Sequence, residues 1–380
     1  MIKISPYVYR KIVDAISFAL REDDLLHFSF SANKLKLIVK RKKILLVSNL
    51  DIECNLSKTE TVKASSLYQI IKHYRGGYMA FEDKKITFKK NEHSVSKNKD
   101  DIPNEIFFLS QRSVSYPKIK TKNSFTLKME HVRNALCEVL LIDKTQELFE
   151  EDSIFDMVSD VEKQSLSLVS LGKEKAILYS IKTECKTNDA ISIISNKKLI
   201  NEVLQNNRYK NDMEIKIYFD NKYLVFVIDD DCYYFNAKPC KNNPYRIVNK
   251  IISDYSKNKI IISLNDLYKC FEKLKTITKE RNIFMQNCYI DLKYKTEYLK
   301  CDVSGAIKER LGRINIYSSF VEMENENKRS YNSHIFSTFI PYLGEDVNIF
   351  FNSNNEPLIV YNPINENNQS YFILMPIIKE

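Results

Sequence analysis

Three acidic clusters are the residues of this chain best suited to chemistry, because neighbouring carboxylates can hold a catalytic divalent cation. They are Asp23-Asp24, Glu150-Glu151-Asp152 and Asp229-Asp230-Asp231. Each lies at the end of an expected element or in a turn, and none adjoins a Gly-rich phosphate loop or a histidine at metal-ligand spacing. The third cluster follows the apolar run that ends at Val227, and its simplest interpretation is a hairpin turn. The sequence therefore predicts neither a catalytic nor a metal site, with a nucleic-acid-processing enzyme as the less favoured alternative.

The eight cysteines and five histidines also lack the spacing of a metal site. No C-x-x-C pair occurs, and no two histidines stand in an H-x-x-x-H pattern. Cys137 and Cys270 fall within helical patterns. We expect reduced, mostly buried thiols and no cofactor.

Length, composition and charge limit the classes of protein that this chain could be. Its 380 residues are usual for two or three domains, and 44% of them are apolar. No stretch approaches the ~18 uncharged apolar residues of a membrane helix, and the N-terminus carries no apolar signal core, so we expect a cytoplasmic protein without a membrane partner. The formal net charge of +9 favours a polyanionic partner such as nucleic acid.

One supersecondary unit occurs three times in the sequence. It consists of an amphipathic helix, a Gly or polar break, a strand, a tight turn and a second strand. The three copies are Ala64 to Lys89, Ser195 to Ile228 and Asn332 to Tyr361, the last with a helix expected over Asn332 to Leu343. Leu67, Leu199 and Ile335 occupy equivalent helix positions, so the unit recurs about every 130 residues.

A second amphipathic helix opens each repeat, with Val8, Val132 and Leu267 at equivalent positions. These helices are expected at Pro6 to Arg21, Met129 to Leu141 and Leu264 to Arg281. The sequence thus predicts an α+β fold of three tandem domains, each with two helices covering one face of a mostly antiparallel sheet. We place the domains at residues 1–120, 121–255 and 256–380.

Three such domains with their helices turned inward would form half of a ring, which a head-to-tail dimer would close. The helix faces opposite the apolar stripes would line the hole, and basic side chains recur on them. The candidates for facing DNA are Arg10, Arg21, Lys72, Arg75, Lys128, Arg133, Lys197, Lys198, Lys269, Lys273 and Lys279.

The order and spacing of the repeats resemble the bacterial DNA polymerase III β subunit, or sliding clamp, over the whole chain. The resemblance is most specific near the C-terminus, in Tyr331-Asn332 with Ile335, in Pro357-Leu-Ile and in Ile373-Leu-Met-Pro-Ile377. The segment Pro244-Tyr-Arg-Ile247 is similar to the family's Phe-Pro-Asp-Tyr segment, one residue shorter. The resemblance implies a ring that encircles duplex DNA and tethers a polymerase to it, without chemistry of its own.

The resemblance also implies a groove between the second and third domains, where short apolar peptides of polymerases, the clamp loader and repair proteins dock. Carried over by position, its wall comprises Phe155, Leu171, Gly172, Lys175, Pro244, Arg246, Ile247, Asn332, Ile335, Pro357, Leu358, Leu374, Met375, Pro376 and Ile377. The chain departs from the family at Leu171-Gly-Lys-Glu-Lys-Ala176, where the family has Thr-Asp-Gly-His-Arg-Leu. A monomeric, clamp-like scaffold for partner proteins is the remaining alternative, because no dimer surface is identifiable from the sequence.

Overall fold

The computed structural model divides the chain into two compact units. Unit 1 comprises Met1–Leu127 and Lys198–Ala237, and unit 2 comprises Lys128–Lys197 and Lys238–Glu380. The described residues are 1–20, 24–31, 33–41, 44–52, 57–90, 105–109, 116–117, 124–142, 154–195, 197–206, 208–220, 222–241, 243–254, 258–280, 289–295, 298–304, 310–322, 328–332, 335, 337–351 and 357–375.

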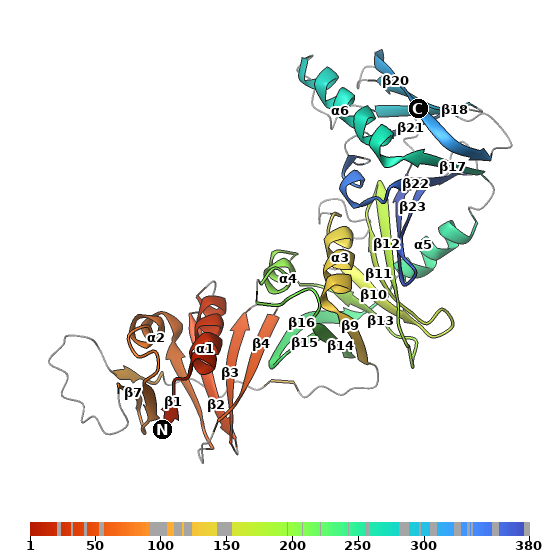
Figure 1. Ribbon diagram of the computed structural model, residues 1–380. Helices are drawn as coiled ribbons and strands as arrows, with labels where there is room; N and C mark the ends of the chain where they lie inside the picture. Colours follow the sequence, from red (N-terminus) through yellow and green to blue (C-terminus); the bar gives the residue numbers. More distant parts are fainter. Residues whose placement is uncertain are drawn as a thin grey trace. The chain divides into compact units, whose positions relative to one another are not determined.

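Unit 1 contains helices α1, α2 and α4 and two groups of strands (Figure 1). The helices are α1 (Pro6–Ala19), α2 (Ala64–Ile71) and α4 (Lys197–Leu204). The strands are β1 (Ile2–Lys3), β2 (Leu25–Ser31), β3 (Lys34–Arg41), β4 (Ile44–Asp51), β5 (Thr59–Lys63), β6 (Tyr78–Phe81), β7 (Lys85–Lys89), β8 (Glu105–Phe107), β9 (Ser124–Lys128), β14 (Glu214–Asp220), β15 (Tyr223–Ile228) and β16 (Asp231–Pro239).

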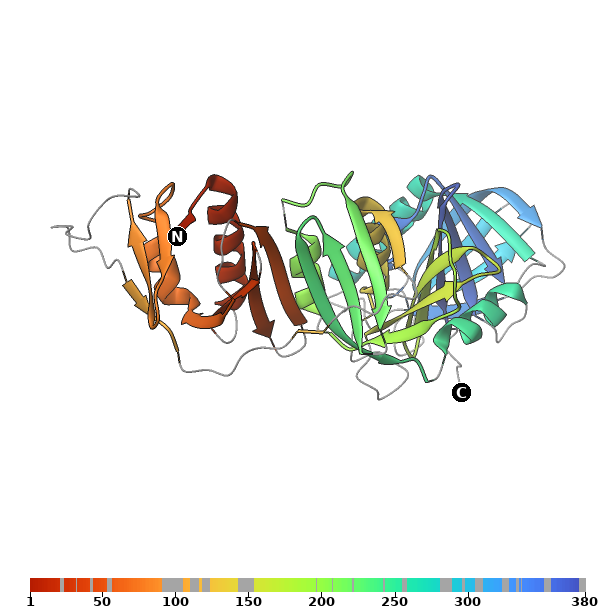
Figure 2. The ribbon, with the colours of Figure 1, turned by 90° about the horizontal axis from the view of Figure 1, so that it is seen from below.

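The larger sheet of unit 1 has the order β5-β2-β3-β4-β16-β15-β14-β9. A separate antiparallel sheet has the order β1-β6-β7-β8. Helices α1 and α2 pack against each other, as Figures 1 and 2 both show. Their apolar stripes are buried, with Ile12 and Leu67 fully inaccessible, so the helix periodicity seen in the sequence points to the core.

Unit 2 contains helices α3, α5 and α6, a 3-10 helix and again two groups of strands. The helices are α3 (Met129–Val139), α5 (Pro244–Ser253), α6 (Leu264–Glu280) and η3 (Ile340–Tyr342). The strands are β10 (Phe155–Asp160), β11 (Ser165–Leu171), β12 (Lys175–Lys182), β13 (Ala190–Ile193), β17 (Asn258–Ser263), β18 (Tyr289–Lys295), β19 (Tyr298–Ser304), β20 (Arg310–Glu322), β21 (Lys328–Asn332), β22 (Asp346–Phe351), β23 (Leu358–Asn365) and β24 (Asn368–Leu374).

The larger sheet of unit 2 has the order β13-β10-β11-β12-β24-β23-β22-β17 and is antiparallel throughout. The strands β21-β18-β19-β20 follow one another in a further antiparallel group. Each strand of the larger sheet has a counterpart at the same place in the larger sheet of unit 1. The two units are therefore built by one rule of strand pairing.

The order of elements along the chain shows the same repetition. Among the described elements, a strand, a helix, four strands, a helix and three strands recur in this order three times, with α5 inserted between the second and third rounds. In the last round the second helix position holds the α-helical residues Ile335 and Ser337, followed by η3. The α+β class and the mostly antiparallel sheets predicted from the sequence are confirmed, whereas the domain boundaries stay a prediction. No helix in the described ranges is long and apolar enough to span a membrane.

The sequence did not predict helix α5, although its start carries a recognisable signal. Asn243 is the N-cap and its side chain accepts a hydrogen bond from the Arg246 amide at 3.2 Å, while Pro244 occupies the first turn. Such a residue pair favours a helix start. On the sequence alone, Pro244 to Ile247 is compared only with a segment of the clamp family, and no helix is assigned there.

The helix predicted over Asn332 to Leu343 is wrong in its extent. Asn332 ends strand β21, and its side-chain oxygen accepts a hydrogen bond from the Ile335 amide at 3.3 Å. Ile335 and Ser337 are α-helical, and Ile340–Tyr342 form the 3-10 helix η3, which contains Pro341. Proline has no N–H and clashes with the preceding turn, so the α-helix does not continue through Pro341 and the segment ends in a 3-10 turn.

Candidate functional site

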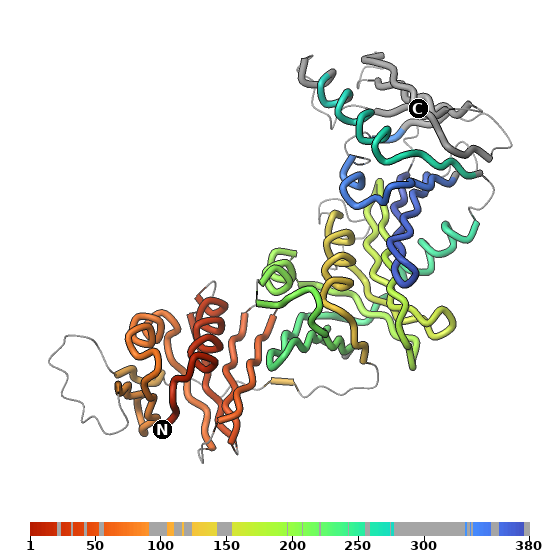
Figure 3. The backbone as a smooth tube through the Cα atoms, viewed as in Figure 1, coloured from red at the N-terminus to blue at the C-terminus, as the bar shows by residue number. Residues whose placement is uncertain are grey.

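Strand β24 joins the last part of the chain to the middle of unit 2. It pairs with β12 from Lys175 opposite Leu374 to Ile181 opposite Asn368, and with β23 on its other side. Figure 3 shows β24 running alongside β12. Beyond the paired residues, the Met375 amide donates to the Glu174 carbonyl oxygen at 2.9 Å. We call this pairing of β12 with β24 the unit 2 joint.

Helix α5 covers one face of the unit 2 joint and helix α3 contacts β11 and β12 from the other (Figure 1). On the α5 face, alternate strand residues form one apolar cluster, which Tyr245 and Val248 of α5 complete. The strand members are Val158, Val169, Leu171, Ala176, Leu178, Ile359 and Ile373, with Met375 packed at the margin.

The α3 face holds the intervening residues of the same strands. The Lys175 ammonium donates to the Leu141 carbonyl oxygen at 3.0 Å and lies 5.9 Å from the centre of the Phe339 ring. Phe339 in turn packs on Phe372, with ring centres 4.5 Å apart. Since Lys175 and Leu374 are directly opposed in the register, Leu374 belongs to this face as well.

A buried carboxyl group lies where α3 crosses the joint. Glu138 is only 3% exposed, and burial raises the pKa of its carboxyl group to about 8, while the Ser370 hydroxyl beside it offsets part of that rise. On the same helix, His131 contacts the Asn368 amide, with Nδ1 and Nδ2 2.7 Å apart. At neutral pH this acid is therefore mostly protonated.

The register divides the predicted groove residues between the two faces of the joint. Leu171 and Met375 lie on the α5 face, next to α5 with its Pro244, Arg246 and Ile247, and the Ile247 side chain is 42% exposed. The residues that pack on the α3 side or lie buried away from α5 are Phe155, Lys175, Leu358 and Leu374.

The remaining predicted groove residues are scattered. Gly172 forms the hairpin before β12, where its amide donates to the Lys175 carbonyl oxygen at 2.8 Å. Ile335 is buried, while Asn332 and Pro357 are half-buried. Pro376 and Ile377 lie outside the described residues. The apolar cluster also contains Ala176, Leu178 and Val248, which the predicted set does not include and which the alternation of β12 and the stripe of α5 indicate.

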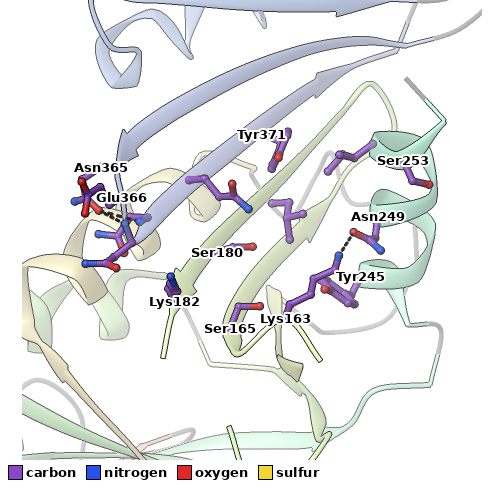
Figure 4. Close-up of a pocket in the computed structure, with 15 residues that line it drawn as sticks. Lys163, Ser165, Ser180, Lys182, Tyr245, Asn249, Ser253, Asn365, Glu366 and Tyr371 are labelled. Carbon is purple, nitrogen blue, oxygen red and sulfur yellow. Dashed lines mark hydrogen bonds between the residues drawn. The ribbon is translucent and has the colours of Figure 1, made fainter. Parts of the chain in front are cut away.

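A polar trough continues the α5 face away from this cluster. Figure 4 shows it between α5 and β24, over the strands β11 and β12, and its volume is about 560 Å³. Its lining comprises Lys163, Ser165, Leu178, Ser180, Lys182, Tyr245, Asn249, Ile252, Ser253, Asn365, Glu366, Asn367, Asn368, Gln369 and Tyr371. The trough shares Leu178, Tyr245 and Tyr371 with the apolar cluster or its margin, so the two form one continuous surface.

The basic side chains predicted to face DNA are mostly at the surface of their helices. Exposed are Arg10, Lys72, Arg75, Lys128, Lys198, Lys269 and Lys273, and half-buried are Arg133 and Lys197. Arg21 and the side chain of Lys279 lie outside the described residues. Lys269 forms an ion pair with Asp266 at 3.7 Å, and Arg75 lies over the Tyr9 ring. Most of these cations are therefore accessible to solvent.

The third acidic cluster, Asp229 to Asp231, has identifiable structural roles. Asp229 and Asp230 form the turn between β15 and β16, as predicted, with Asp229 at a positive φ of 54°. Asp231 is fully buried and pairs with the Lys11 ammonium at 3.1 Å and with the Arg208 guanidinium. Its negative charge is thus balanced by protein cations. Among the residues that the structure describes, no group of three or more His, Cys, Asp or Glu is placed to hold a metal ion.

The first cluster has a comparable structural role. Asp24 accepts hydrogen bonds from the Ser65 amide at 2.7 Å and from the Ser65 hydroxyl at 2.6 Å, at the start of α2. A carboxylate at this end of a helix satisfies free N–H groups and complements the helix dipole. Asp23 and the cluster Glu150 to Asp152 lie outside the described residues.

Comparison with solved structures shows that this is the fold of the sliding clamps. A DNA polymerase sliding clamp from Pseudomonas aeruginosa matches with a TM-score of 0.71 at 12% identity, covering 97% of both chains. A putative DNA polymerase III beta subunit from Eubacterium rectale matches with a TM-score of 0.72 at 14% identity, again over 97% of both. The Helicobacter pylori beta clamp bound to a DNA ligase peptide matches with a TM-score of 0.67 at 14% identity, over 97% of this chain and 98% of that one. No protein-family model and no curated protein sequence matches the chain.

Proposed function

We propose that this protein is a DNA sliding clamp, a processivity factor without catalytic chemistry that encircles duplex DNA as a head-to-tail homodimer in the cytoplasm. The observation that carries the proposal is the fold, which matches sliding clamps over 97% of the chain with TM-scores about 0.7. Each of three repeats, at 1–120, 121–255 and 256–380, would contribute two helices to the lining of the hole. Retention by topology needs no tight contact with DNA, and lysine and arginine contacts to phosphates allow sliding because they read no bases.

The strand order supports ring closure by a second copy. In unit 1, β4 of the first repeat pairs with β16, the last strand of the second repeat. In unit 2, β12 of the second repeat pairs with β24, the last strand of the third. By the same rule β20 of the third repeat should pair with the last strand of a first repeat, which is β8. Among the described strands β8 has one neighbour, β7. Strand β20 pairs with β19 along its first half and with β17 along its second half, so its first half has one strand neighbour among the described residues.

Strand β8 also has the side chain expected at an interface. Phe107 is 68% exposed, more than any other large apolar residue that the structure describes. An open strand edge that carries an exposed aromatic residue is a ready site for strand addition. We infer that β8 of one copy adds to β20 of another, which extends a sheet in the order β21-β18-β19-β20-β8-β7-β6-β1 and closes the ring with two such contacts.

The partner groove that we propose is the α5 side of the unit 2 joint. It retains Leu171, Met375, Pro244, Arg246 and Ile247 of the predicted set and adds the exposed margin of the apolar cluster. Polymerase and clamp-loader peptides are the expected occupants. The side chains of Phe155, Lys175, Leu358 and Leu374 would act as support behind the strands.

A DNA-retention assay tests the function directly. Protein assembled on circular duplex DNA should stay bound through gel filtration and be lost once the circle is cut, because only topology holds a sliding ring. Persistent binding to linear DNA, or no retention on circles in the presence of a clamp loader, would refute the proposal.

The interface is tested by Phe107→Lys. The wild type should show twice the 44.7 kDa mass of one chain in light scattering, and the variant should be a monomer, because the added charge would have to be buried next to β20. Tyr68→Lys is the matched control, since Tyr68 is 40% exposed on α2 of the same unit and outside the proposed interface. A dimeric Phe107→Lys protein would place the interface elsewhere.

A further inference from the structure

The trough beside α5 differs in chemistry from the apolar groove that it continues. Its floor is made of the small hydroxyl side chains Ser165 and Ser180, which are 7% and 8% exposed. Two lysines belong to its rim, Lys163 before β11 and Lys182 at the end of β12, and the rim contains one acid, Glu366. The Ser180 hydroxyl is paired with the Ser167 hydroxyl at 2.9 Å, so the groups that a ligand would meet are mainly those of the rim.

The two lysines come from different parts of the fold, but both line the trough. The Lys163 ammonium donates to the Asn249 side-chain oxygen at 2.7 Å and lies 5.6 Å from the centre of the Tyr245 ring, so it is held on the α5 wall, as Figure 4 shows. Lys182 is exposed, and its backbone amide binds the Asn367 carbonyl oxygen at 2.7 Å, which fixes the strand end beside the β23–β24 turn. Within the described residues, no carboxylate forms a direct ion pair with either ammonium group. The Asp160 carboxylate attracts Lys163 from behind the wall, where it accepts hydrogen bonds from the Lys163 amide at 3.0 Å and the Tyr245 hydroxyl at 2.8 Å.

We propose that the trough binds an acidic segment that flanks the apolar docking motif of a partner protein. The inference rests on the proposed clamp function, since the apolar part of the same peptide would occupy the groove. Continuity with the apolar cluster favours this occupant, as do the two lysines of the lining, which contains Glu366 as its one acid. Amide side chains such as Asn249 can pair with the backbone of an extended peptide, whereas the two ammonium groups attract its carboxylates. The chain would thereby select among partners by the charge next to their motifs.

Fluorescence anisotropy with two synthetic peptides tests this selection. Both carry the same apolar pentapeptide of leucine and phenylalanine, followed or preceded by three glutamates in one and three glutamines in the other. At low ionic strength the full-length wild type should bind the glutamate peptide about fivefold more tightly, since exposed ion pairs each contribute a few tenths to one kcal/mol. The double variant Lys163→Gln with Lys182→Gln should bind both peptides equally, with unchanged affinity for the glutamine peptide.

Lys186→Gln with Lys241→Gln is the matched control, because both lysines are exposed in unit 2 and neither lines the trough. The control removes the same net charge and should keep the preference. Equal binding of both peptides by the wild type, or a preference that survives the double variant, would overturn the trough proposal while leaving the groove intact. If neither peptide binds, whether the three polar residues precede or follow the apolar pentapeptide, the groove proposal and the trough proposal are both overturned. Met375→Glu should weaken the binding of both peptides, because Met375 lies in the apolar groove, and this variant therefore tests the groove independently of the trough.

Discussion

The two joints between repeats share one backbone design but differ in charge. In unit 1, β4 pairs with β16 and α1 packs on the sheet beside them, and in unit 2, β12 pairs with β24 and α3 takes the place of α1. Asp231 opens β16, whereas Asn368 opens β24. When α1 and α3 are aligned at their equivalent residues Val8 and Val132, Lys11 of α1 corresponds to Ala135 of α3.

The unit 1 joint is therefore fixed by charge. Lys11, 2% exposed, and Arg208 both pair with the buried Asp231, and Arg208 also pairs with Asp14. A further ion pair joins Arg41 of β3 to Glu202 of α4 at 3.1 Å. Each buried charge has a partner, which is the condition under which such charges are tolerated.

The unit 2 joint has an acid without a paired cation among the described residues. The count that aligns Val8 with Val132 brings Asp14 level with Glu138, whose pKa of about 8 keeps it mostly protonated at neutral pH. The buried cation of this joint, Lys175, binds the Leu141 carbonyl oxygen instead. Neutral contacts replace the ion pairs, among them His131 with Asn368. We infer that strand pairing determines how two repeats join. The polar groups under the covering helix determine how the stability of the joint depends on salt and pH.

The largest effect is expected from Asp231→Asn in unit 1. The substitution keeps the shape but leaves Lys11 and Arg208 without their shared buried counter-ion, so the free energy of unfolding should fall by about 3 kcal/mol. Urea unfolding measures the loss, and faster hydrogen exchange in β16 than in β24 would assign it to the unit 1 joint. Asp229→Asn is the control, because Asp229 is 49% exposed and should cost under about 1 kcal/mol. A similarly small loss for Asp231→Asn would mean that charge does not hold this joint.

Glu138→Gln should change how the stability of the unit 2 joint depends on pH. The pKa of Glu138 is about 8 in the folded chain against 4.5 for an ordinary glutamate, so the unfolded chain releases the proton first. The contribution of the neutral acid is fully present below pH 4.5 and is lost as the pH rises to about 8, by at most about 1.4 kcal/mol per pH unit. The glutamine variant stays neutral and should be the more stable protein at pH 8.5. Urea unfolding from pH 5 to pH 9 in ~1-unit steps measures the difference, and parallel curves would show that Glu138 is ionised throughout.

The smallest effect is expected from His131→Ala, which removes the contact between α3 and Asn368 across the unit 2 joint. Loss of one neutral hydrogen bond should lower the free energy of unfolding by about 1 kcal/mol, with little dependence on salt. Asn134→Ala, at an exposed position of α3, controls for helix propensity. If high salt weakens the unit 2 joint as much as the unit 1 joint, the contrast drawn between them fails.

Local pattern predicted most of the elements but not their partners. The stripes of α1, α3 and α6 and the alternation of β11 and β12 are visible in the sequence, since each depends on residues a few positions apart. The predicted groove residues were carried over by position alone, and position could not show that Lys175 binds the Leu141 carbonyl oxygen on the face away from α5. A one-residue step along a strand changes the face, and only the observed register assigns it.

The sequence by itself determined the repeats, the two helix positions in each, the hairpin turn at Asp229 and the recurrence of basic side chains on the helices. These features follow from periodicity and from turn and cap preferences, which act over short distances along the chain. Tertiary structure alone decided that β24 docks on β12, that Asp231 receives two cations while Glu138 receives none, and that a polar trough continues the apolar groove. Each of these depends on segments far apart in sequence, whose pairing, burial and charge balance exist only once the chain has folded.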